Sequence, residues 1–86
     1  MDNLNHHYGV TIEDEKHGNE RVIRAFPSDQ LQTALWYYKI GIQVSQQRKD
    51  LKRLYVSVKL VMENTGHKTV ICQTLIEGES EDEKNA

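Results

Sequence analysis

Residues 54–63, LYVSVKLVME, alternate between apolar and other side chains more regularly than any other part of this chain. The apolar positions are Leu54, Val56, Val58, Leu60 and Met62. This period of two is typical of a β-strand that buries one face. A sheet with one apolar face has to be covered by a second layer, so the segment favours a two-layer domain.

Three further segments have strand-like patterns. Residues 68–77, KTVICQTLIE, follow the short loop NTGH, so that they form a hairpin with residues 54–63. Residues 8–15, YGVTIEDE, alternate in the same way, and residues 21–26, RVIRAF, follow a turn that contains Gly18. Neither face of residues 21–26 is cleanly polar, so the register of this strand stays open. The sequence predicts two antiparallel hairpins.

A helix is predicted between the two hairpins, from Asp29 to about Asp50. Pro27 ends the preceding strand, Ser28 offers an N-cap hydroxyl, and Asp29 places negative charge in the first turn. At about 100° per residue, one apolar stripe faces the sheet. It consists of Leu31, Ala34, Leu35, Tyr38 and Ile42. The alternative is that Gly41 ends the helix early as a C-cap.

These elements predict an α+β fold in ββαββ order, a four-stranded antiparallel sheet with one long helix packed on one face. Residues 8–77 form the single domain, because 86 residues supply only one core. Residues 1–7 are expected to be a flexible N-terminus and residues 78–86 a disordered acidic tail. A helix of about 22 residues is about 33 Å long, so it overhangs a sheet under about 20 Å wide unless it lies along the strands.

A second apolar stripe lies nearly opposite the first on the predicted helix. It consists of Trp36, Tyr37, Ile40 and Val44. If the helix continues past Gly41, these residues face away from their own sheet. Exposed aromatic and aliphatic side chains in one patch are typical of protein interfaces. The stripe therefore predicts an interface with a second copy of the chain or with a partner protein; if Gly41 ends the helix, the same residues join the core.

The basic segment is the second candidate binding site. It contains Arg48, Lys49, Lys52 and Arg53. Residues 1–38 carry a net charge of −3, residues 39–68 carry +5 and residues 69–86 carry −4, so positive charge is concentrated in the middle of the chain. Clustered cations are required to bind phosphates, but cations near a helix C-terminus also complement the helix dipole. The total charge of −2 argues against a dedicated nucleic-acid-binding protein.

Signs of catalysis, metal binding and membrane insertion are missing from the sequence. The single cysteine, Cys72, lies in a strand-like segment, and the four histidines have no close-spaced pair of the kind that binds zinc. There is no glycine-rich phosphate loop and no nucleophile elbow. We therefore expect no enzymatic activity, no metal and no cofactor. Without a long apolar run or a signal-peptide pattern, we expect a cytoplasmic protein that does not associate with membranes.

The leading hypothesis is a small, non-enzymatic protein-interaction module. It would act as a homodimer, or dock its helix face and a sheet edge on a partner protein, in an accessory or inhibitory role of the kind carried by phages and mobile elements. The alternative is a nucleic-acid-binding module that uses Arg48, Lys49, Lys52 and Arg53. A third hypothesis is an enzyme subunit whose chemistry lies in another chain.

Overall fold

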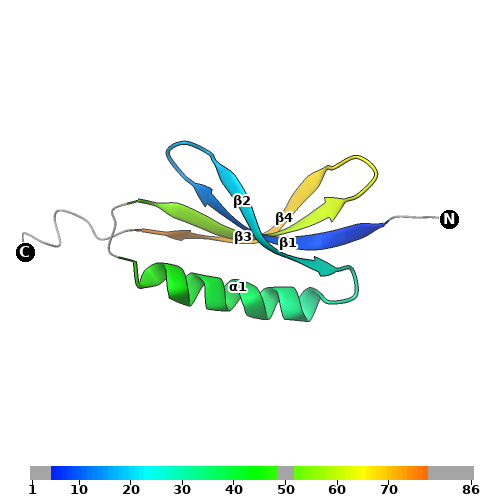
Figure 1. Ribbon diagram of the computed structural model, residues 1–86, viewed down its shortest axis with the longest axis horizontal. Coiled ribbons are helices and arrows are strands. Elements are labelled where there is room, and N and C mark those ends of the chain that lie inside the picture. The colour runs from blue at the N-terminus through cyan, green and yellow to red at the C-terminus, as the bar shows by residue number, and fades with distance from the viewer. Residues whose placement is uncertain (1–4, 49–51, 78–86) are drawn as a thin grey trace, which may run out of the picture.

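The computed structural model describes residues 5–48 and 52–77, which form a sheet with one helix on one face (Figure 1). The elements are β1 (His6–Asp14), β2 (Glu20–Pro27), α1 (Leu31–Gln46), β3 (Leu54–Met62) and β4 (Lys68–Ile76). The strand order is β2-β1-β3-β4, and every neighbouring pair is antiparallel. The predicted α+β fold in ββαββ order is confirmed. β1 begins two residues before the predicted start, and the predicted tail, residues 78–86, lies outside the described residues.

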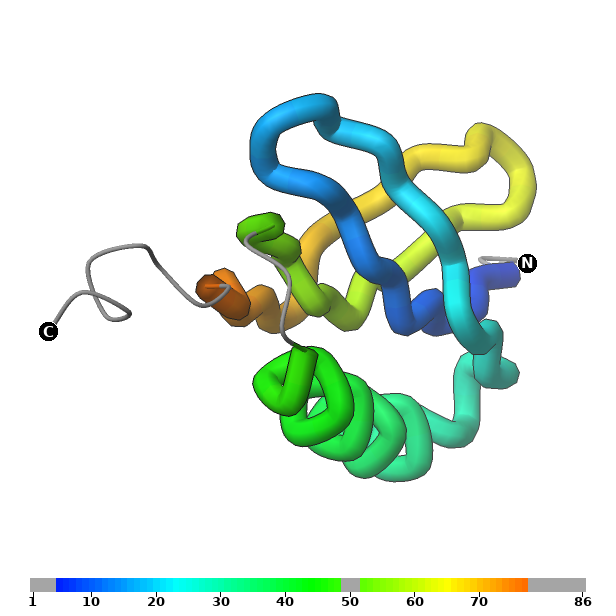
Figure 2. The backbone as a smooth tube through the Cα atoms, turned by 60° about the vertical axis from the view of Figure 1, so that its left-hand side comes forward, coloured from blue at the N-terminus to red at the C-terminus, as the bar shows by residue number. Residues whose placement is uncertain are grey.

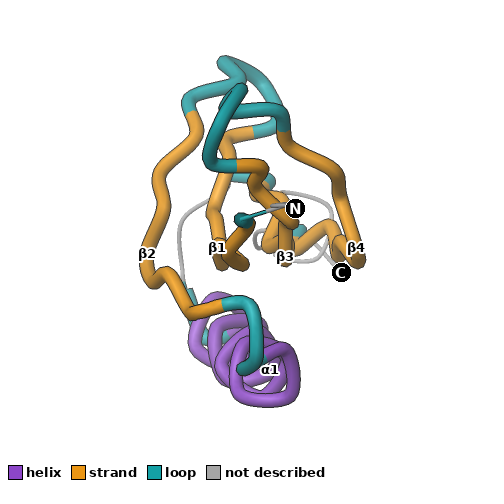
Figure 3. Tube along the Cα trace, turned by 90° about the vertical axis from the view of Figure 1, so that its right-hand side faces the viewer, coloured by secondary structure: helices purple, strands orange, loops and turns teal. Residues whose placement is uncertain are grey.

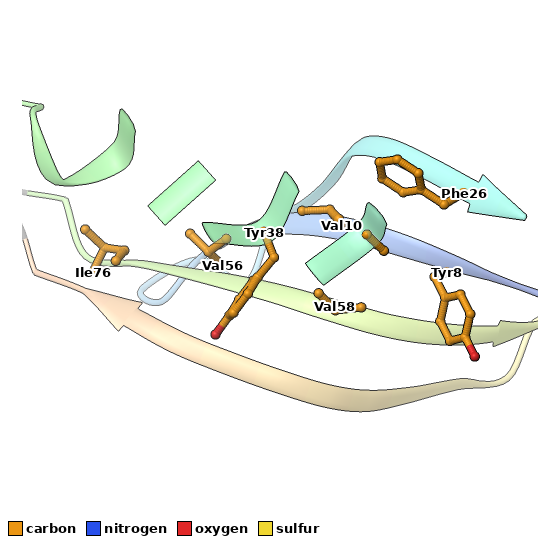
Figure 4. Close-up of a cluster of buried hydrophobic side chains, with 8 residues drawn as sticks. Tyr8, Val10, Phe26, Tyr38, Val56, Val58 and Ile76 are labelled. Carbon is orange, nitrogen blue, oxygen red and sulfur yellow. The ribbon is translucent and has the colours of Figure 1, made fainter. Parts of the chain in front are cut away.

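The hydrophobic core lies between α1 and the two central strands. Val10 of β1 and Val56 and Val58 of β3 have no exposed surface. Tyr8 and Phe26 extend this core at one end and Ile76 at the other, as Figure 4 shows. The alternating pattern of residues 54–63 thus predicted the buried face of β3 correctly. Gly18 and Gly66 have φ values of 71° and 74°, which explains why glycine suits both hairpin turns.

The uncertain register of the second strand has a structural cause. The pairing of β1 with β2 shifts between Val10 and Thr11: Val10 is opposite Arg24, whereas Thr11 is opposite Val22. Ile23 is therefore the extra residue of a β-bulge, and simple alternation fails there. A second shift in the pairing of β3 with β4 leaves Ile71 as the extra residue of β4.

The helix differs from its prediction at both ends. Its N-cap is Gln30, without a side-chain capping bond, so the predicted Ser28 cap is wrong, and no acidic residue lies in its first turn. α1 continues through Gly41 and ends at Gln46. The helix has 16 residues, which corresponds to about 24 Å rather than about 33 Å. Asp50, the predicted end, lies outside the described residues.

We expect Gly41→Ala to stabilise the domain. Gly41 has no positive φ, and a Cβ atom there would lie 3.6 Å from Val56 Cγ1 and 3.9 Å from Ile23 Cδ1, which are ordinary contacts. Alanine in a helix interior is favoured over glycine by about 1 kcal/mol, which corresponds to a rise of about 4–8 °C in Tm for a domain of this size. Thermal unfolding followed by circular dichroism measures the change. Gly41→Leu is the control that should lower Tm. A lower Tm for Gly41→Ala would contradict the prediction and would show that the helix packs on the sheet too closely for a Cβ atom at this position.

Candidate functional site

One side of α1 packs on the sheet. Ala34, Tyr38 and Ser45 are buried, while Leu31, Leu35 and Ile42 are partly buried beside the core. All five residues of the predicted sheet-facing stripe therefore contact or join the core. Their placement fixes the rotation of the helix and decides which side chains point outward.

The opposite side of α1 presents Trp36, Ile40 and Val44, which we call the α1 outer face. Trp36 is 60 % exposed and Val44 is 61 % exposed, and Ile40 lies between them with intermediate exposure. No other described element covers this side of the helix (Figure 1). Lys39 is the one charged residue among the 16 residues of α1. An exposed helix face with an aromatic anchor and so little charge has the composition of an interface centre.

Tyr37 was predicted to belong to this interface stripe, but the structure places it at the junction of α1 with β2. Its ring packs on Phe26 with 5.7 Å between the ring centroids. The guanidinium of Arg24 lies over both rings, 5.6 Å from the Phe26 centroid and 5.9 Å from the Tyr37 centroid. Tyr37 therefore anchors the edge of the helix on the sheet. Its side chain is only partly exposed, whereas that of Trp36 is exposed.

The described arginines of the basic segment bond to a carboxylate and to backbone carbonyls. Arg53 Nε lies 3.2 Å from Glu15 Oε1. Arg48 donates from Nε to the Ser45 carbonyl at 3.2 Å and from Nη2 to the Lys52 carbonyl at 2.9 Å. Lys49 lies outside the described residues. Of the described cations, Arg48 and Arg53 thus help to connect the end of α1 to the first hairpin turn.

A pocket of about 520 Å³ opens beside this segment. Its walls are Asp14, Glu15, Lys16, His17, Lys52 and Arg53. Asp14 organises the turn: its Oδ1 accepts from the backbone N–H of Lys16 at 2.8 Å and of His17 at 3.2 Å. Hydrogen bonds from His17 lower the pKa of the Asp14 carboxyl, so this wall stays negative at neutral pH. Because both acidic and basic side chains line the pocket, it offers a phosphate no uniformly positive surface.

An ion cluster that sequence reasoning missed lies on the far face of the sheet, opposite α1. It consists of Glu13, Glu20, Lys59 and Lys68. Glu20 forms an ion pair with Lys59 through one oxygen and accepts from Lys68 Nζ at 2.6 Å through the other. Lys59 Nζ is also 3.7 Å from Glu13 Oε1. The hydrogen bonds from Lys59 and then Lys68 lower the pKa of the Glu20 carboxyl.

The ion cluster connects the two edge strands, since Glu20 lies on β2 and Lys68 on β4. Figures 2 and 3 show how this is possible: both hairpins curl away from α1, so the far face is concave. Thr11 and Ser57 are buried on this face, although the one helix of the described residues lies on the other face. A lysine in the middle of a predicted strand, Lys59, was the sequence signal that could have indicated the ion cluster. Its partners come from other strands, and the residue is only 9 % exposed.

Polar side chains tie β4 to the rest of the domain. The Ser57 hydroxyl donates to Gln73 Oε1 at 2.9 Å, and the hydroxyls of Tyr38 and Thr74 are 2.5 Å apart. Burial raises the pKa of the Tyr38 hydroxyl, so this group remains protonated. The Thr11 hydroxyl oxygen is buried and has no hydrogen-bond partner among the described residues.

The described residues contain no group of three or more histidine, cysteine, aspartate and glutamate side chains suited to hold a metal ion. His7 pairs with Glu63 at 3.2 Å and His17 with Asp14 at 3.3 Å, and Cys72 is half-buried beside the core. Within residues 5–48 and 52–77, α1 is neither long nor apolar enough to cross a membrane. Comparison of the chain with family models, with curated proteins and with solved structures gave no match.

Proposed function

We propose that this chain is a non-enzymatic protein-interaction module that works as a homodimer, with two copies packed through the α1 outer face. The observation that carries the proposal is the exposure of Trp36 and Val44 on a helix with one charged residue in 16. An accessory or inhibitory role toward a partner protein is part of this proposal.

The spacing of the α1 outer face suits a second copy of the same helix. Trp36 and Val44 lie four residues before and after Ile40. If two helices cross in antiparallel orientation at Ile40, the large Trp36 side chain of each copy meets the smaller Val44 of the other. Such a two-fold contact is self-complementary. The neighbouring exposed residues Gln43 and Gln47 are uncharged, so these two positions bring no like charges together.

The expected dimer is weak. A helix about 24 Å long and about 10 Å wide offers on the order of a few hundred Å² per copy, whereas a standard interface buries about 800 Å² per partner. We therefore expect a dissociation constant in the micromolar range or higher. Trp36 should supply most of the binding energy, as aromatic anchors generally do.

Sedimentation equilibrium over a range of concentrations tests the dimer. The wild-type protein should move from monomer to dimer as concentration rises, and Trp36→Ala, Ile40→Glu and Val44→Glu should each weaken association at least about tenfold, because a central anchor is lost or a charge is buried. Gln46→Glu is the matched control: it adds the same charge at an exposed helix position outside the face and should leave association unchanged. Circular dichroism should show the same fold in all four variants.

A wild-type protein that stays monomeric at millimolar concentration would contradict the dimer. So would an Ile40→Glu variant that unfolds from a monomeric wild type, because Ile40 would then belong to the core. The nucleic-acid alternative predicts binding to arbitrary duplex DNA that weakens steeply with salt and depends on Lys52 and Arg53. The pairing of Arg53 with Glu15 favours the protein interface over this alternative.

A further inference from the structure

The two edges of the sheet are protected to different degrees. β2 carries Glu20, Arg21 and Arg24 and ends at Pro27. Charged side chains and proline on an edge strand discourage pairing with another strand. β2 is therefore an edge strand protected against pairing with another chain.

β4 lacks most of these protective features. Its nine residues include no proline and no glycine, and its single charged residue, Lys68, stands at the first position. Val70 is 49 % exposed and Ile71 is 41 % exposed. In Figure 3, no described element lies beyond β4 on its outer side. The bulge at Ile71 and the charge of Lys68 are the features of this strand that disfavour pairing.

The edge of β4 is also held in a fixed conformation. Side-chain contacts anchor it at its first residue and in its second half: Lys68 with Glu20 at 2.6 Å, Gln73 with Ser57 at 2.9 Å and Thr74 with Tyr38 at 2.5 Å. A strand that is already ordered loses little conformational entropy when another strand pairs with it. β4 is thus a preorganised template.

We propose that the edge of β4 binds an extended segment of a partner protein by antiparallel strand addition. The bound segment is uncharged and β-branched over about eight residues, has a basic residue at its start and has an acidic residue at its end. The absence of charge between Lys68 and Glu77 sets the uncharged part. In an antiparallel pair, the start of the segment lies beside Glu77 and its end beside Lys68, whose side chain is 41 % exposed.

The choice of a partner protein rests on the proposed homodimer. If α1 already joins two copies, self-pairing of β4 would add a second, different two-fold interface to each copy. Two different two-fold interfaces build a larger assembly, either a closed tetramer or an open chain of copies, and not a dimer. A segment from another protein fills the same edge without this consequence, and the dimer then presents two binding edges.

The probe is a synthetic decapeptide that copies residues 68–77 with serine in place of Cys72, because this sequence has the required charges and β-branched content. It is titrated into isotopically labelled wild-type protein and into Val44→Glu, with amide chemical shifts and amide hydrogen exchange as readouts. We expect shift changes centred on β4 and at least tenfold slower exchange of its outward-facing amides. A peptide with its two end charges exchanged should bind about threefold or more weakly, and a peptide N-methylated at alternate residues should not bind.

Equal peptide-induced changes in wild type and in Val44→Glu would support strand addition whether or not the α1 dimer exists. Failure of one proposal can therefore be distinguished from failure of the other. Equal binding of the N-methylated peptide, or shift changes confined to α1 or to the pocket at Arg53, would overturn it. Outward β4 amides that are already protected without peptide, in assemblies larger than a dimer, would overturn it in favour of a second copy.

Discussion

A Val58→Asp variant is expected to show no cooperative unfolding transition. Val58 has no exposed surface and lies at the centre of the core between α1 and the sheet. An unpaired carboxylate in that position costs several kcal/mol, which is comparable with the whole stability of a small domain, about 5–15 kcal/mol in general. Urea unfolding followed by circular dichroism and by Trp36 fluorescence measures the loss.

The matched control is Val70→Asp, which makes the same substitution at a side chain that is 49 % exposed on β4. It should fold and unfold cooperatively, since the new carboxylate remains hydrated and lies on the same face as Lys59. A Val58→Asp protein that unfolds as cooperatively as Val70→Asp would show that the faces of β3 are reversed.

The second large effect concerns the ion cluster. Glu20→Ala should lower stability by about 2 kcal/mol, the typical value of a hydrogen-bonded charged group, or roughly 10 °C in Tm. Among the described residues, the variant leaves the buried Lys59 with Glu13 alone, at 3.7 Å, and it removes the contact of Lys68 with β2. Glu13→Ala is the matched control and should have a smaller effect, because it removes only that longer contact. Equal effects of the two variants would show that the cluster is not centred on Glu20.

The same carboxylate makes stability depend on pH. The pKa of Glu20 in the folded chain lies below its ordinary value of 4.5, so the folded state binds its proton less readily than the unfolded state. The stabilisation from Glu20 is therefore fully present above about pH 4.5 and is lost as pH falls through the folded pKa. In Glu20→Gln, Tm should fall less between pH 6 and pH 3 than in the wild type. An unchanged pH profile would show that other groups cause the acid sensitivity.

Local patterns were sufficient for most of the fold. The alternation of residues 54–63 identified the buried face of β3, and the glycines at positions 18 and 66 located both hairpin turns. The phase of the apolar residues also continued correctly through Gly41, because the packing of Tyr38 and Ile42 in and against the core outweighs the low helix propensity of one glycine. These features depend on neighbours in the sequence, so the sequence reveals them.

Two predictions failed where competing local signals decide the boundary of an element. Ser28 has the right chemistry for an N-cap, but the turn in which the Gln30 N–H donates to the Pro27 carbonyl delays the helix by two residues. The good helix formers after Gly41 suggested an end near Asp50, yet α1 ends at Gln46, and the Arg48 side chain then bonds to the Ser45 and Lys52 carbonyls. Propensity does not include such tertiary and turn contacts.

By itself, the sequence determined the order of the elements, the face of β3 that is buried and the presence of a second apolar stripe on the helix. Only the tertiary structure decided that Tyr37 leaves this stripe to pack on Phe26 while Trp36 and Val44 remain exposed. It also brought Glu20 of one edge strand to Lys68 of the other, across 48 residues of sequence. The physical reason is that the curl of the sheet sets these distances, and the curl follows from bulges and twist in all four strands together.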